Sequence, residues 1–262
     1  MTVQFNSANL LKASAVLLSS VALFGNKGCN RADLYNPTAN EYQLQFLGDS
    51  YIDFGSGKKG TAYIPLAINQ YATGYYGETI VYKDRSVTGA TLEEVQEQYE
   101  DAKAHALADD SYEIQTIVVN GGANNIREAC KTEKIPDGYE GTNCETLMDA
   151  TEITAKAFID QLTTEVPNVI WMGRYYMAPF VTLQSVIDDF DNTIKAYCES
   201  KANCFYMDPR YNEDLGLYGL WNYDDAVNYV LNDGKHVNPT GGELIAAELW
   251  SILTQPGWNI YF

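Results

Sequence analysis

Runs of consecutive apolar residues alternate along this chain with segments in which apolar residues recur every three or four positions. From Ile114 onward the runs are uninterrupted, which predicts strands buried on both faces, because a strand with one wet face alternates apolar and polar residues. Such strands occur in parallel sheets covered by helices. The predicted strands are Tyr42–Leu47, Thr79–Tyr82, Ile114–Asn120, Asn168–Met172 and Cys204–Met207.

Between the strands, apolar spacings of three and four residues predict amphipathic helices. One begins at Thr91, with Glu93 and Glu94 in its first turn, where carboxylates interact favourably with the helix dipole. Another ends at Val166-Pro167, because proline disfavours helical geometry in the residue before it. The four apolar stripes are Leu92, Val95, Tyr99, Ala102 and Ala106; Ile153, Ala157, Phe158 and Leu162; Val186, Ile187, Phe190, Ile194 and Tyr197; and Ile245, Leu249 and Ile252.

The repeated order of strand, helix and strand implies right-handed βαβ units. The predicted fold class is α/β, a three-layer α/β/α sandwich around a central, mainly parallel five-stranded sheet. No repeat or shift in composition divides residues 41–262, so we expect them to form one domain. Parallel strands end along one edge of their sheet, and ligands bind in the crevice there. The residues that follow each strand are therefore the candidates for chemistry.

The N-terminal segment differs from the rest of the chain. Ala13 to Phe24 is apolar apart from three serines, which is too short to span a bilayer and fits the apolar part of a secretory signal. Gly28-Cys29 is similar to a bacterial lipoprotein processing site, although its two preceding residues are unusual there. We expect residues 1–29 to be a signal peptide, with either a lipid on Cys29 or cleavage elsewhere, and 30–40 to be a linker. The protein would then be exported: periplasmic, anchored to the outer membrane as a lipoprotein, or secreted.

Charge and cysteine content narrow the class of protein further. The net charge of −18 argues against a nucleic-acid partner, because phosphate binding needs clustered lysine and arginine.

Apart from Cys29, the cysteines form two locally spaced pairs, Cys130 with Cys144 and Cys198 with Cys204. We expect two disulfides, which persist in oxidising compartments and agree with export. Metal ligation is the alternative, but neither pair has C-x-x-C spacing and the chain has 2 histidines, so we expect no metal.

A nucleophile and a base are both present at the predicted edge of the sheet. Ser50 follows Gly48-Asp49 where the first strand ends, although Gly-Asp-Ser alone is also ordinary turn chemistry. His236 lies near the C-terminus and is the candidate base. Asp233 can bind its Nδ1 and hold the tautomer in which Nε2 accepts a proton.

Two further positions could stabilise an oxyanion together with the backbone N–H of Ser50. Gly89 lies just ahead of a predicted helix, where a free backbone N–H can face the crevice. By itself it would be a flexible loop glycine. Asn124 follows two glycines after the third strand and could offer its side-chain amide, or it could cap a helix or turn instead.

Taken together, these four segments resemble the sequence blocks of the SGNH, or GDSL-type, hydrolases. Gly48–Tyr51 resembles the nucleophile block, Ser86–Thr91 the block whose glycine N–H lines the oxyanion hole, Gly122–Asn125 the block with the oxyanion asparagine, and Asp233–His236 the block with acid and base. Asn125 stands where aspartate is usual, at a structural position. The resemblance implies the flavodoxin-like SGNH hydrolase fold and cleavage of carboxylic esters through an acyl-enzyme, with no cofactor.

The substrate is less narrowly defined by the sequence. Tyr51, Tyr175 and Trp221 are candidate substrate contacts, because aromatic faces suit sugar rings and acyl groups, but packing of loops on the sheet is the alternative. Short-chain acyl or acetyl esters fit, and so does a carbohydrate O-acetylesterase acting on polysaccharide. A non-catalytic carbohydrate-binding or adhesion module of the same fold stays open. A flavodoxin-like FMN protein is disfavoured, because acidic residues replace the phosphate loop after the first strand.

Overall fold

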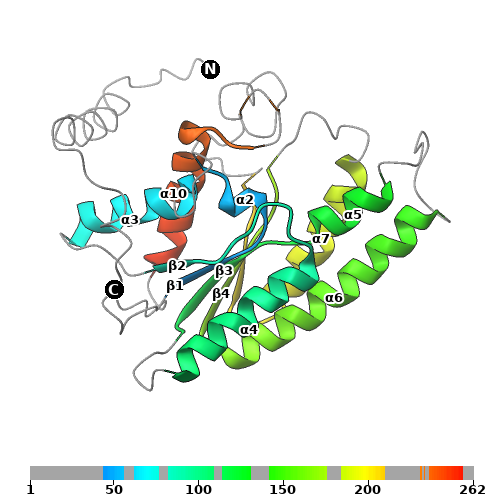
Figure 1. The fold of residues 1–262 in the computed structure, drawn as a ribbon, viewed down its shortest axis with the longest axis horizontal. Helices are drawn as coiled ribbons and strands as arrows, with labels where there is room; N and C mark the ends of the chain where they lie inside the picture. The colour runs from blue at the N-terminus through cyan, green and yellow to red at the C-terminus, as the bar shows by residue number, and fades with distance from the viewer. Residues whose placement is uncertain are drawn as a thin grey trace, which may run out of the picture. The chain divides into compact units, whose positions relative to one another are not determined.

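The computed structural model describes residues 44–55, 62–76, 82–108, 114–130, 142–175, 184–209, 231, 233 and 236–255. Within these residues a five-stranded sheet has the order β2-β1-β3-β4-β5, and every neighbouring pair is parallel (Figure 1). The strands are β1 (Leu44–Leu47), β2 (Tyr82–Asp84), β3 (Thr116–Val119), β4 (Asn168–Met172) and β5 (Cys204–Met207).

Helices cover both faces of this sheet (Figure 1). On one side lie α4 (Leu92–Ala108), α6 (Asn143–Glu165) and α7 (Gln184–Glu199), and on the other lie α3 (Tyr63–Tyr76) and α10 (Pro239–Leu253). Two shorter helices, α2 (Ser50–Asp53) and α5 (Ala123–Cys130), follow β1 and β3. The predicted three-layer α/β/α sandwich is confirmed, and the carboxyl ends of all five strands meet at one edge.

β4 and β5 match their predicted bounds, and β3 is shorter than the predicted Ile114–Asn120. β2 contains Tyr82, the last residue of the predicted strand Thr79–Tyr82, whose residues 79–81 lie outside the described residues. Lys83 in β2 is half-buried, and its Cα pairs with that of Gln45 in β1. β2 lies at an edge of the sheet, and two of its three residues are half-buried.

Local sequence signals explain the ends of the predicted helices. Thr91 and Glu94 form a reciprocal cap at the start of α4: Thr91 N donates to Glu94 Oε2 at 2.7 Å, and Glu94 N donates to Thr91 Oγ1 at 3.4 Å. Val166 is the C-cap of α6, directly before Pro167. Asn238 caps α10 through Gly241 N at 2.9 Å. The apolar spacing does not predict α2, α3 or α5, because none of these helices carries a long amphipathic stripe.

Two disulfides join neighbouring elements: Cys130–Cys144 links α5 to α6, and Cys198–Cys204 links α7 to β5. Among the described residues no cluster of histidine, cysteine, aspartate or glutamate could hold a metal ion. No helix in that part of the chain has the length and apolarity needed to cross a membrane. The predicted signal peptide, the 30–40 linker, Cys29 and Trp221 lie outside the described residues.

Candidate active site

The chain turns sharply at Gly48, where β1 ends. Gly48 has φ +153°, and a Cβ there would lie 1.9 Å from Asn120 Oδ1, so a side chain does not fit. Gln98 of α4 holds the turn at two points, accepting from Gly48 N at 2.7 Å and donating to Gly48 O at 3.0 Å. The turn is therefore fixed to both β3 and α4.

Asp49 supports this turn from inside the protein. Its Oδ1 accepts from Tyr51 N at 2.9 Å, and its own N–H donates to Asn120 Oδ1 at 3.1 Å. Complete burial raises the pKa of Asp49 above its ordinary value, although the hydrogen bond from Tyr51 N opposes the rise. Ser50 follows as the first residue of α2 and is half-buried. Asp49 has a structural role here, and Ser50 is the residue presented at the sheet edge.

Gly89 lies in a second turn that packs against the first. Ala90 N donates to Val87 O at 3.0 Å, and Gly89 between them has φ +87°, which favours glycine. Val87 N donates to Gly48 O at 2.9 Å, so the two turns share a hydrogen bond. Among the described residues, the backbone N–H groups of Ser50 and Gly89 donate no hydrogen bond. Both remain available to a ligand oxygen.

Asp53, the last residue of α2, holds the second turn from its other side. Its Oδ2 accepts from Thr88 N and from Thr88 Oγ1, each at 2.7 Å. Thr88 directly precedes Gly89, so this carboxylate sets the position of the Gly89 N–H relative to the helix that Ser50 begins.

Asn124 lies in the first turn of α5 rather than in a loop. Its Nδ2 donates to Ala90 O at 2.9 Å and to Asp49 Oδ2 at 3.3 Å. An amide nitrogen carries two hydrogens, so both have partners in this structure. The longer contact, to Asp49, is the weaker one and is the one that an oxyanion would replace.

Asn125, the next residue, makes different contacts. Asn125 Oδ1 accepts from Leu92 N at 2.8 Å, and its Nδ2 donates to Glu93 Oε2 at 2.8 Å. These bonds tie the start of α5 to the start of α4. The structural role expected for this position agrees with these contacts.

His236 is held by Asp233, three residues earlier. The Nδ1 of His236 lies 2.6 Å from Asp233 Oδ2, and His236 N donates to Asp233 Oδ1 at 3.1 Å. This two-point contact engages Nδ1, and within the described part of the chain Nε2 makes no hydrogen bond. The side chain of His236 is 17% exposed. The pair can act as an oriented base, as the spacing predicts.

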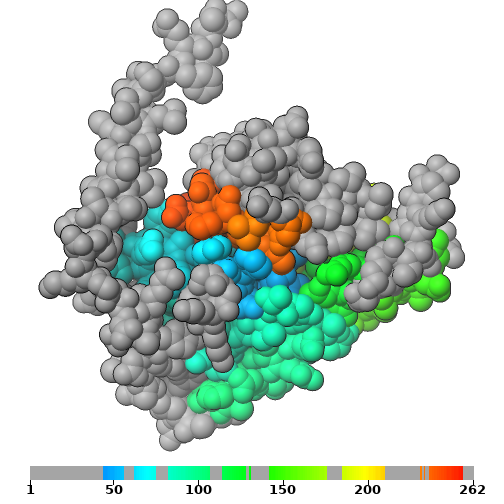
Figure 2. Space-filling view, turned by 45° about the horizontal axis from the view of Figure 1, so that its top comes forward, coloured from blue at the N-terminus to red at the C-terminus, as the bar shows by residue number. Residues whose placement is uncertain are grey.

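The structure brings His236 to the helix that carries Ser50. Phe54, the C-cap residue of α2, stacks on the imidazole with ring centroids 4.0 Å apart and planes at 7°. In Figure 2 the segment leading into α10 lies directly beside the segment around α2. Among the described residues Ser50 Oγ makes no hydrogen bond to His236. Catalytic hydrogen bonds of unliganded sites often form only when substrate binds.

Tyr51 and Tyr175 lie beneath these groups. Their rings are tilted against each other with centroids 4.7 Å apart, and they are 4% and 2% exposed. Tyr175 Oη also accepts from Val237 N at 3.3 Å, next to His236. Burial raises the pKa of both phenols. The structure gives both rings a packing role that links the segment around Ser50 to the segment around His236, and contact with substrate stays a prediction.

A buried ion pair lies just beyond β4. Arg174 Nη2 is 2.6 Å from Asp191 Oδ1, Arg174 Nε is 3.1 Å from the same oxygen, and both residues are buried. The guanidinium also lies 4.7 Å from the centroid of the Phe190 ring. The pair joins the end of β4 to α7.

Four residues that hold the site were not predicted from the sequence: Asn120, Gln98, Asp53 and Phe54. Asn120 ends a buried apolar strand, and a polar residue at that position was a usable signal. Gln98 and Phe54 show no such signal in the sequence, because each contacts a residue that is far away in the chain.

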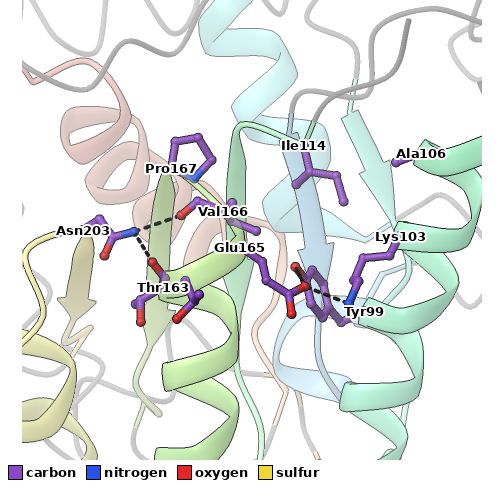
Figure 3. A pocket seen from close by; sticks show the side chains of 10 residues that line it. Tyr99, Lys103, Ala106, Ile114, Thr163, Glu165, Val166, Pro167 and Asn203 are labelled. Carbon is purple, nitrogen blue, oxygen red and sulfur yellow. Dashed lines mark hydrogen bonds and ion pairs between the residues drawn. The ribbon is translucent and has the colours of Figure 1, made fainter. Parts of the chain in front are cut away.

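A separate pocket of 530 Å³ lies at the opposite edge of the sheet, where β3, β4 and β5 begin (Figure 3). Its polar groups pair with one another: Tyr99 Oη donates to Glu165 Oε2 at 3.0 Å, and Lys103 Nζ lies 2.7 Å from the same oxygen. Asn203 Nδ2 donates to backbone oxygens of Thr163 and Val166, each at 2.9 Å. These contacts brace α4 and β5 against α6 and are distinct from the serine site.

The five-stranded parallel sheet with helices on both faces is the fold of the SGNH hydrolases. The family model of GDSL-like lipases and acylhydrolases matches residues 46–244, and the chain belongs to that family. Among curated proteins, none matches the sequence.

Solved structures share the fold at low sequence identity. The acetylxylan esterase Axe2 of Geobacillus stearothermophilus is 16% identical, with a TM-score of 0.59 over 82% of this chain and 95% of that one. A protein of Parabacteroides merdae, described as a GDSL-like lipase, is also 16% identical, with a TM-score of 0.58 over 83% of this chain and 99% of that one.

Proposed function

We propose that the protein hydrolyses carboxylic esters with Ser50 as nucleophile, His236 as base and Asp233 as its orienting carboxylate. The observation that carries this proposal is the His236–Asp233 contact of 2.6 Å, held beside the helix that Ser50 begins. A histidine with its Nδ1 bound to a carboxylate presents Nε2 to a nearby hydroxyl, which is the requirement for activating serine.

The reaction would proceed through an acyl-enzyme. Ser50 Oγ attacks the ester carbonyl while His236 Nε2 takes the serine proton. The N–H groups of Ser50 and Gly89 and the amide of Asn124 stabilise the resulting oxyanion. His236 then gives its proton to the leaving alkoxide. Water, deprotonated by His236, attacks the acyl group, and the proton returns to Ser50 as the acid leaves.

The proposed substrates carry short acyl or acetyl groups. Among these, carbohydrate O-acetyl esters are supported by the structural similarity to an acetylxylan esterase, the class of substrate named for that enzyme. A small-molecule or polysaccharide ester is thus the proposed partner. Trp221, outside the described residues, stays a candidate substrate contact.

The test compares hydrolysis of p-nitrophenyl acetate through octanoate by the wild type, Ser50→Ala and His236→Ala. Both variants should lose at least about 10³-fold in kcat, because nucleophile and base act as a unit. Equal rates for all three proteins would refute the enzyme and favour a binding module. Release of acetate from acetylated xylan, compared with rates on the p-nitrophenyl series, separates a carbohydrate esterase from a general short-chain esterase.

We also propose export, with residues 1–29 as the signal. The two disulfides support this proposal, because such bonds persist in oxidising compartments. Metabolic labelling with a fatty acid, compared between the wild type and Cys29→Ser, tests lipid attachment. Label that remains on Cys29→Ser, or no label on the wild type, would refute lipid attachment at Cys29.

A further inference from the structure

We propose that Phe54 is a positioning residue for His236; this inference rests on the proposed function, in which His236 is the base. The two rings are nearly parallel, with centroids 4.0 Å apart. The contact between His236 Nδ1 and Asp233 holds the imidazole at one edge, about which the ring could still pivot. A flat aromatic surface against the ring face removes that freedom.

Phe54 also supplies a connection that Asp233 does not. Asp233 and His236 belong to the same short segment, so their hydrogen bonds orient the imidazole only within that segment. Phe54 is the C-cap of α2, whose first residue is Ser50. The stack therefore sets the base relative to the short helix that carries the nucleophile.

Both partners of the stack are anchored to helices. Phe54 O accepts from Tyr63 N, the first residue of α3, at 3.0 Å. His236 lies two residues before Asn238, the N-cap of α10, whose side chain accepts from Gly241 N at 2.9 Å. The position of each ring is thus tied to the start of one helix.

The starts of α3 and α10 pack closely against each other. A Cβ on Gly242, in the first turn of α10, would lie 2.6 Å from Tyr63 Cβ. The missing side chain lets the two helices approach at the ends that carry Phe54 and His236. The ring stack follows from this packing and is not a contact between two loose surface groups.

Proton transfer between Ser50 and His236 depends on alignment, and a misplacement of about 1 Å can cost about 10²-fold in rate. Replacing Phe54 by leucine keeps an apolar side chain but removes the flat face. We expect Phe54→Leu to lower kcat about 10- to 100-fold with little change in KM. Phe54→Tyr keeps the ring and should retain kcat within about threefold, because its added hydroxyl sits on a half-buried side chain.

The experiment measures kcat and KM on p-nitrophenyl acetate for the wild type, Phe54→Leu, Phe54→Tyr and His236→Ala. Phe205→Leu is the matched control, since Phe205 is half-buried on β5, which β3 and β4 separate from β1. The melting temperature of each variant is measured alongside, and Phe54→Met replaces Phe54→Leu if that variant does not fold.

The double variant Phe54→Leu/His236→Ala shows whether Phe54 acts through His236. If it does, the double variant is no slower than His236→Ala. A further loss in the double variant, together with a raised KM for Phe54→Leu, would make the ring a substrate contact and overturn the inference. Wild-type kcat in Phe54→Leu with an inactive His236→Ala would also overturn it while the proposed function stands. Activity retained by His236→Ala would instead refute the proposed function.

Discussion

Asn124 donates its side-chain amide to the Asp49 carboxylate across 3.3 Å, which ties the first turn of α5 to the turn before Ser50. In the proposed mechanism, Asn124 would exchange this contact for one to the oxyanion when substrate binds. The contact would also hold the amide in place beforehand, so that less ordering is needed during the reaction.

We expect Asn124→Ala to lower kcat by about 10²–10³, the usual cost of losing one oxyanion donor. Asn125→Ala is the matched control, because it removes the adjacent amide, whose bonds go to Leu92 N and Glu93. That variant should lose about 1 kcal/mol of stability and keep kcat. Steady-state kinetics and urea unfolding measure both effects. An equal loss of kcat in the two variants would contradict the role of Asn124.

Asp53→Ala should free the turn that carries Gly89, because Thr88 loses both of its hydrogen bonds to that carboxylate. The Gly89 N–H would then be ordered only as substrate binds, and we expect kcat to fall about tenfold. Asp149→Ala removes an exposed aspartate from α6 and is the control. The prediction fails if both variants hydrolyse p-nitrophenyl acetate at the wild-type rate.

Two glycine replacements should have opposite effects on stability. Gly48→Ala places a Cβ 1.9 Å from Asn120 Oδ1 and forces an unfavourable φ, so we expect a loss of about 3 kcal/mol or more in the free energy of unfolding. Gly74→Ala lies within α3, where a Cβ meets nothing within 4 Å, and should gain about 0.5–1 kcal/mol. Thermal and urea unfolding compare them. Similar values for both would show that local backbone geometry does not decide the effect.

Glu165 makes stability depend on pH. Partial burial pushes its pKa up, but the hydrogen bonds from Lys103 and Tyr99 outweigh burial and hold the pKa below the ordinary 4.5. A lowered pKa in the folded state stabilises the protein above pH 4.5, and this contribution is lost as the pH falls through the folded-state value.

We therefore expect Glu165→Gln to be less stable than the wild type near pH 7, by about 1 kcal/mol or less, since the side chain is partly exposed. The difference should shrink as the pH falls below 4.5. Glu97→Gln, an exposed position on α4, is the control. Urea unfolding from pH 3 to pH 7 measures the effect, and a difference that grows toward acid pH would contradict it.

Much of the fold follows from local patterns. β4 and β5 occupy their predicted residues because buried parallel strands are apolar on both faces. The helix that follows Thr91 begins where the sequence places a capping threonine and, three residues later, a glutamate. By contrast, α3 was missed, because Tyr63–Tyr76 is largely apolar and shows no distinct amphipathic stripe, and because it packs against α10, which is distant in the sequence.

The sequence by itself determined the candidates: a serine after the first strand, an Asp-x-x-His unit, and a glycine and an asparagine after two other strands. It could do so because parallel topology gathers strand ends at one edge, whatever the details of packing. Only the tertiary structure decided that Asn124 lies in a helix, that Gln98 holds Gly48, and that Phe54 stacks on His236. The two contacts join residues that are distant in the chain, so no periodic pattern in the sequence predicts them. They arise because whole helices pack against the sheet and against each other.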